Sequence, residues 1–261
     1  MENITNSNSR TRYFGNISEE SQASSIHEIN QLQNYPEACD TLIVWKTLAE
    51  VISQSVSGLD QLSTFQDRIV ALEFNLWCVQ HEKSLVQITK LSLANKQIKT
   101  IPIEITQLTQ LEALDLSNNQ ITIIPREIAQ LTQLEVLALS NNQIIIIPRE
   151  IGQLSQLEVL ALSNNQITII PREIAQLTQL EVLALSNNQI IIIPREIGQL
   201  SQLQKLYLND NQITTIPREI GQLTQLQLLY LQNNPNSTIS NQTGQLSDIV
   251  EALGLNNNNN N

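Results

Sequence analysis

Apolar residues recur along the middle of the chain in a fixed unit of 23 residues. The full units begin at Ile88, Leu111, Leu134, Leu157, Leu180 and Leu203, and a truncated seventh begins at Leu226. The units at 134–156 and 180–202 are identical letter for letter. A fixed period of this length predicts a solenoid of stacked repeats, and such a repeat carries no catalytic chemistry of its own.

Aligned, the units read LxxLxLxxNxIxxIPxxIxxLxx, and the apolar letters are expected to point inward. In the second unit these letters are Leu111, Leu114, Leu116, Ile121, Ile124, Ile128 and Leu131. One unit alone cannot bury this surface, so neighbouring units must stack. Full burial stabilises the fold by roughly 1.5–3 kcal/mol per side chain. A proline after the last isoleucine, such as Pro125, fixes φ and predicts an irregular or short helical return on the convex side.

The LxL letters predict a short strand in each unit, and the strands are expected to stack in parallel. The predicted fold is therefore a curved α/β solenoid with a parallel sheet on its concave face. Side chains alternate along a strand, so the letters on either side of the second leucine point outward. These outward positions are Ala113, Asp115, Val136, Ala138, Val159, Ala161, Val182, Ala184, Lys205, Tyr207, Leu228 and Tyr230.

The outward positions predict a protein-docking surface, because an exposed apolar strip ends in two tyrosines. Apolar patches mark interaction sites, and tyrosine is enriched at binding hot spots. An acidic row, made of Glu112, Glu135, Glu158 and Glu181, borders the strip. The alternative is a recently duplicated, featureless face without a selected partner, since the central units are nearly copies of one another.

Asparagines that share one register of the repeat are expected to form a ladder inside the turn after each strand. Its members are Asn119, Asn142, Asn165, Asn188, Asn211 and Asn234, with Lys96 in the same register of the first unit. Their amides can bond backbone groups that a tight turn leaves unpaired, and stranding one such buried group costs about 1–3 kcal/mol. Arg-Glu pairs that follow the prolines are interpreted as a solvated ion-pair row.

Charge and composition exclude several function classes. The formal net charge is −11 and there is no basic patch, whereas nucleic-acid binding needs a cationic footprint. No apolar stretch is long enough to span a bilayer, and the N-terminus lacks the apolar region of a secretory signal. The two cysteines, Cys39 and Cys78, do not make a disulfide framework, which favours a reducing compartment.

The sequence predicts no enzyme, cofactor or metal. His27 and His81 are the only histidines, and both lie outside the repeats. No nucleophile–base set, glycine-rich phosphate loop or metal-ligand spacing can be assembled. We therefore expect a monomer that binds a protein partner.

Five segments are expected along the chain. Residues 1–35 are polar and predict a disordered arm. Residues 36–87 carry two amphipathic patterns, near 37–55 and 59–82, which predict a helical cap over the solenoid or an adaptor that recruits a partner. The solenoid covers 88–235, a C-terminal cap 236–255, and a poly-asparagine tail 256–261.

The IPxxIxxL form of the unit resembles the intracellular class of leucine-rich repeat (LRR) proteins, which includes Ras-group scaffolds. It is also similar to LRR proteins of intracellular bacteria that live in amoebae, whose helical head ends in a tryptophan-containing segment like 74–78. The resemblance covers about 88–235. It implies a non-enzymatic cytoplasmic scaffold that binds a protein partner on the concave face. The alternative that it implies is a secreted bacterial effector or ubiquitin-ligase adaptor, delivered into a host cytosol by a non-classical route.

Overall fold

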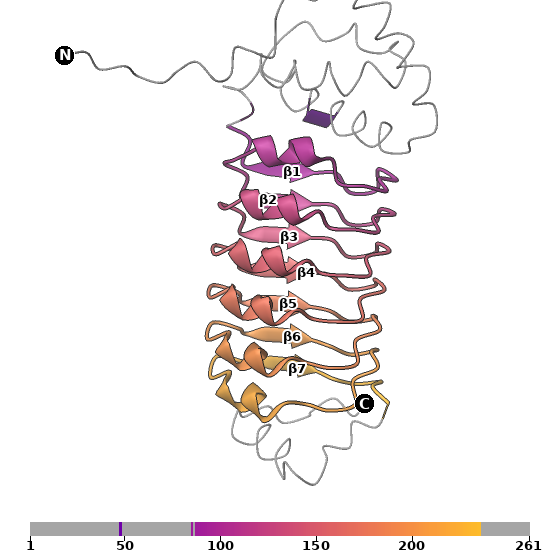
Figure 1. Ribbon diagram of the computed structural model, residues 1–261, viewed down its shortest axis with the longest axis vertical. Helices are drawn as coiled ribbons and strands as arrows, with labels where there is room; N and C mark the ends of the chain where they lie inside the picture. Colours follow the sequence, from indigo (N-terminus) through magenta and orange to yellow (C-terminus); the bar gives the residue numbers. More distant parts are fainter. Residues whose placement is uncertain (1–46, 49–84, 86, 236–261) are drawn as a thin grey trace, which may run out of the picture.

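The computed structural model of the 261-residue chain describes residues 47–48, 85 and 87–235. Within 87–235 the chain winds into regular turns, each contributing one three-residue strand (Figure 1). The strands are β1 (Lys90–Ser92), β2 (Ala113–Asp115), β3 (Val136–Ala138), β4 (Val159–Ala161), β5 (Val182–Ala184), β6 (Lys205–Tyr207) and β7 (Leu228–Tyr230). They pair in parallel in sequence order, so they form one open sheet. The predicted solenoid is confirmed.

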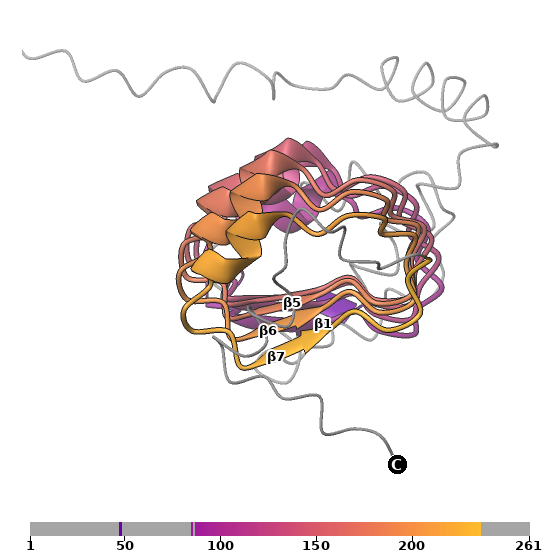
Figure 2. The ribbon, with the colours of Figure 1, turned by 90° about the horizontal axis from the view of Figure 1, so that it is seen from below.

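A short 3-10 helix returns the chain between successive strands. These helices are η3 (Ile103–Gln107), η4 (Arg126–Gln130), η5 (Arg149–Gln153), η6 (Arg172–Gln176), η7 (Arg195–Gln199) and η8 (Arg218–Gln222). Seen along the solenoid axis, the strands lie on one side of each turn and the helices on the other (Figure 2).

Proline starts each of these helices because its backbone suits the entry position. Pro125 has φ −66° and ψ 142° directly before η4. Its ring fixes φ, and its missing N–H would have no partner at a helix start. Its carbonyl oxygen accepts the first helical hydrogen bond, from the Ile128 N–H at 3.1 Å.

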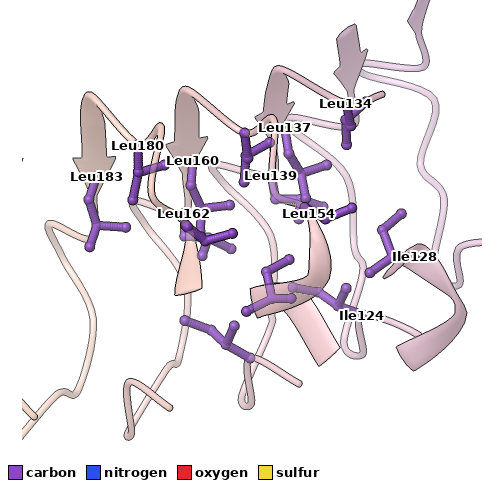
Figure 3. Close-up of a cluster of buried hydrophobic side chains, with 14 of the residues drawn as sticks. Ile124, Ile128, Leu134, Leu137, Leu139, Leu154, Leu160, Leu162, Leu180 and Leu183 are labelled. Atoms are coloured by element: carbon purple, nitrogen blue, oxygen red, sulfur yellow. The ribbon is translucent and has the colours of Figure 1, made fainter. Parts of the chain in front are cut away.

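The pattern of apolar letters fills the space between sheet and helices. Leucines of consecutive turns point into one continuous interior (Figure 3). Leu137, Leu160 and Leu183 occupy equivalent positions in β3, β4 and β5, and each has no exposed surface. Because every turn buries its apolar face against its neighbours, stability depends on the stack and not on any single unit.

The segment opposite the sheet also pairs between turns. Isolated parallel bridges join Ile146 to Ile169, Ile169 to Ile192, and Ile192 to Thr215. The Thr168 N–H donates to the Ile145 carbonyl at 3.4 Å. Backbones bridged in this way lie near the strand spacing of about 4.8 Å. The two sides of the solenoid therefore have similar spacing, which limits its curvature.

The N-terminal end of the core receives side chains from outside the repeats. Thr47 and Leu48 are helical, and both are buried. Leu48 and Leu85 belong to the same buried cluster as Ile88 of the first turn. The rest of the predicted arm, helical cap, C-terminal cap and tail lies outside the described residues. Among the residues that are described, no helix has the length and apolar content to cross a bilayer.

Gly152 allows close contact between η5 and η6. A Cβ added there would lie 2.5 Å from the Glu173 carbonyl oxygen, which is backbone and cannot rotate away. Replacing glycine by alanine ordinarily stabilises a protein by about 0.4–1 kcal/mol. Here we expect Gly152→Ala to lower the free energy of unfolding by about 1–3 kcal/mol, as overpacking does. Urea denaturation followed by circular dichroism measures this difference.

Ala175 supplies the control, because it holds the same register one turn later. Ala175→Gly introduces no clash and should cost only about 0.5–1 kcal/mol through backbone entropy. A Gly152→Ala variant as stable as wild type, or more stable, would show that the two turns separate freely.

Candidate protein-binding face

The solvent side of the β1–β7 sheet, here called the sheet face, corresponds to the predicted concave face. Two rows of side chains point outward from it, because residues on either side of each buried strand leucine face solvent. Parallel register aligns Val136, Val159 and Val182 with Lys205 and then Leu228. The second row runs through Asp115, Ala138, Ala161, Ala184, Tyr207 and Tyr230. Ala113 precedes Val136 in the first row.

These outward side chains are half-buried along most of the sheet face. The valines and alanines of β3, β4 and β5 are partly covered by their neighbours in adjacent strands. Leu228, on the last strand, is 38% exposed. The face is therefore a smooth apolar strip whose largest apolar group lies at its C-terminal end.

Tyr207 and Tyr230 stack on each other at this end. Their ring centroids are 5.2 Å apart and the ring planes differ by 8°. The stack follows from register, because the two residues are direct partners in the β6–β7 ladder. Stacked rings hold each other in one orientation, so they offer a rigid aromatic surface at low conformational cost.

A polar network flanks the tyrosines. The Asn209 and Asn233 amides donate to the two carboxylate oxygens of Asp210, at 2.5 and 2.7 Å. The Ser186 hydroxyl donates to Asn209 Oδ1 at 2.6 Å. Donation from Asn233, and then from Asn209, lowers the pKa of Asp210 below its usual value. These hydrogen bonds favour the ionised form of the carboxylate in the turn that follows β6.

Sequence reasoning missed this network, although a signal was present. The central units read Ser-Asn before the ladder asparagine, whereas this unit reads Asn209-Asp210. The departure falls next to Tyr207, another departure from the repeat. Polar changes that gather with aromatic changes in one unit indicate a specialised end of the face.

The opposite end of the sheet face is polar. The Ser92 hydroxyl donates to the Asp115 carboxylate at 3.3 Å, and the Ser117 N–H donates to the same carboxylate at 3.0 Å. Along one border, Glu135 and Glu158 are exposed, while Glu112 and Glu181 are half-buried. The apolar strip therefore has an acidic border along one side and polar groups at its N-terminal end.

The asparagines of the ladder hold the turns that carry this face. Asn165 Nδ2 donates to the carbonyls of Leu139 and Leu162, both at 3.0 Å. Its Oδ1 accepts the Ile144 N–H at 2.9 Å. Asn119, Asn142, Asn188, Asn211 and Asn234 repeat these contacts. Each side chain joins two turns, so the ladder is built into the backbone of the solenoid.

The residue before each ladder asparagine has a left-handed backbone. Asn118, Asn141, Asn164, Asn187, Asp210 and Asn233 have φ between 55° and 59°. Asparagine and aspartate tolerate this region better than other non-glycine residues. In each Asn-Asn pair, the second asparagine is thus the ladder member. The first asparagine allows the left-handed turn, and the repeat pattern alone did not predict this role.

The Arg-Glu row lies on the helix side, away from the sheet face. Each pair is intra-turn, as in Arg126 Nε to Glu127 Oε1 at 3.0 Å, and the arginine side chains are 75–82% exposed. The pairing raises the pKa of Arg126 and lowers that of Glu127, chiefly through the shared hydrogen bond. Exposed pairs of this kind stabilise little.

Among the described residues, no group of three or more histidine, cysteine, aspartate or glutamate side chains is placed to hold a metal. Both histidines and both cysteines lie outside the described residues. The described surface on the sheet side carries an apolar strip, an aromatic pair and charged borders.

The family model for the leucine-rich repeat region matches residues 45–183, 133–206 and 172–255. The chain belongs to the leucine-rich repeat family. Solved LRR structures agree with this assignment. A plant receptor chain, the peptide hormone receptor RGFR1 in complex with RGF2, is 36% identical with a TM-score of 0.52, and the match covers 56% of this chain and 24% of that chain. A search of curated proteins finds no match.

A second receptor is similar at a higher identity. It is the LRR ectodomain of the membrane receptor kinase GASSHO1/SCHENGEN3 from Arabidopsis thaliana, in complex with CASPARIAN STRIP INTEGRITY FACTOR 2. Identity is 42%, the TM-score is 0.50, and the match covers 52% of this chain and 17% of that chain. An LRR protein of Leptospira interrogans is 29% identical with a TM-score of 0.35, and covers 60% of this chain and 58% of that one. The chain thus spans at most about a quarter of the two receptor chains.

Proposed function

We propose that this LRR chain is a non-enzymatic binding module whose protein partner lies on the sheet face. The observation that carries the proposal is the stacked Tyr207–Tyr230 pair at the end of the apolar strip. Rigid aromatic groups beside apolar surface are the usual anchors of protein interfaces. The two LRR receptors described above are complexes with other molecules, which supports a binding role for the family.

The layout of the face indicates how a partner would be held. An apolar segment of the partner covers the valine strip, and the tyrosines contact it at one end. Lys205 and the Asp210 network lie beside the tyrosines and supply charged contacts. The acidic border adds specificity by disfavouring acidic segments, since like charges across an interface are costly.

The proposal is tested by capture from lysates of candidate host and bacterial cells, with wild-type chain beside a Val159→Glu variant. Val159 is central in the strip, and glutamate there adds a charge to the contact surface. We expect a protein that wild type retains and Val159→Glu loses.

Gln153→Glu is the matched control, because it adds the same charge at the exposed end of η5 on the opposite side. A partner lost equally in both variants would argue for a general charge effect. A partner kept in both variants would place binding outside the sheet face.

Location and partner identity belong to the same proposal. The cytoplasmic setting, and the alternative of an exported effector or ligase adaptor, depend on the N-terminal 87 residues and stay predictions. The resemblance to LRR proteins of bacteria that live in amoebae also stays a prediction.

A further inference from the structure

A second apolar surface lies opposite the sheet face. Four isoleucines, one per turn, point outward from the segment before each helix: Ile123, Ile146, Ile169 and Ile192, which are 70%, 67%, 69% and 63% exposed. Backbone bridges between turns keep Ile146, Ile169 and Ile192 in register. Beside this row, Ile145 and Ile191 are 48% and 46% exposed. We call these six residues the isoleucine face.

The isoleucine face gathers six exposed large apolar side chains on one side of the solenoid. Contiguous exposed apolar patches of several hundred Å² mark interaction sites. Successive rows are about 4.8 Å apart, so the face forms a regular array across four turns. Ile123, Ile145 and Ile146 line one hollow together with Thr122 and Pro125.

Large and small residues alternate beside the main row. The register reads Thr122, Ile145, Thr168, Ile191 and Thr214 along the stack. Thr168 leaves a gap between Ile145 and Ile191, and Thr122 and Thr214 leave gaps on the outer sides of these isoleucines, so the gaps repeat every second turn. A surface that fits these ridges and gaps must have the same spacing. The isoleucine face of another copy has this spacing when the two solenoids run antiparallel and are offset so that isoleucine faces threonine.

Charge also favours a second copy on this side. Each arginine that borders the isoleucine face is paired with the glutamate next to it, so the border is neutral overall. On the sheet face, two copies would bring unpaired acidic rows together in a chain of net charge −11. Like charges across an interface are costly.

We propose that the isoleucine face is the interface of a homodimer, in which Ile145 and Ile191 of each copy enter the threonine gaps of the other. Such an interface is isologous, as in most homo-oligomers. This proposal replaces the expected monomer and leaves the sheet face open for a partner.

The first test is sedimentation velocity of the full chain, for wild type and for Ile146→Thr/Ile169→Thr/Ile192→Thr. Thr100 and Thr215 hold the same register, so the repeat accepts threonine there. We expect wild type to dimerise. In the variant, the dissociation constant of the dimer should rise at least about tenfold. The control Val136→Thr/Val159→Thr/Val182→Thr replaces three apolar β-branched side chains by threonine on the sheet face and should keep the dimer.

The second test fills the gaps, with Thr122→Ile/Thr168→Ile/Thr214→Ile. Interlocking predicts a weaker dimer although the surface becomes more apolar, whereas unspecific adhesion predicts a stronger one. A wild-type monomer at about 100 μM, a dimer that survives the isoleucine-to-threonine changes, or stronger association after gap filling would each overturn the proposal. Circular dichroism verifies that each variant is folded.

Discussion

Replacing Asn165 with leucine should lower the free energy of unfolding by about 2–4 kcal/mol. Leucine has the same branched shape, so packing is kept while the hydrogen bonds are lost. The Ile144 N–H loses the acceptor that it has in Asn165 Oδ1. The Leu139 and Leu162 carbonyls each lose a donor. Asn165 is 9% exposed, so water reaches these groups poorly. Urea denaturation measures the loss.

Asn164 provides the control in the same turn. It is exposed, its φ is 57°, and its backbone N–H donates to the Ser186 carbonyl at 2.9 Å. Glycine accepts this φ without strain, so Asn164→Gly should leave stability nearly unchanged. If Asn165→Leu unfolded at the same urea concentration as Asn164→Gly, the ladder would contribute little to stability.

Replacing Tyr207 or Tyr230 with alanine should weaken partner binding about 30-fold each, the effect of losing a hot-spot contact of about 2 kcal/mol. Each ring also orients the other, so the double variant should lose less than the product of the two single effects. Both side chains point out of the sheet, so the fold should be kept. Isothermal titration with the captured partner measures the affinities.

Phenylalanine substitutions separate the ring from its hydroxyl. Tyr207→Phe and Tyr230→Phe keep the stack. If binding depends on aromatic surface, the affinity for the partner should fall less in these variants than in the alanine variants. Unchanged affinity in both alanine variants would remove the tyrosines from the interface.

Much of the fold could be predicted because each letter of the repeat has one physical purpose. Leucines at the LxL positions must be buried, so they set the strand and its two faces. Pro125 and its equivalents end the preceding segment, which places a short helix after them. With the strand register known, the letters that flank each buried leucine identify the outward rows of the sheet face.

The turn and the far side were harder to predict. In the run 144–147 all four letters are isoleucine, yet Ile144 and Ile147 are 0% and 2% exposed while Ile145 and Ile146 are 48% and 67% exposed. Within the run itself nothing distinguishes inside from outside, and only the alignment with the other units assigns Ile144 and Ile147 to the inward letters. That distinction comes from the backbone path between the asparagine turn and the proline, and it creates the isoleucine face.

By itself, the sequence determined the repeat length, the buried positions and the parallel order of the strands, because periodic burial allows only stacked turns. The tertiary structure decided which side chains from different turns meet. Stacking brings Tyr207 onto Tyr230, residues 23 apart in the chain, and joins Ser186 to Asn209 across the same distance. It also decided how closely turns approach at Gly152. These contacts depend on the spacing between turns, which is a property of the assembled stack rather than of any single repeat.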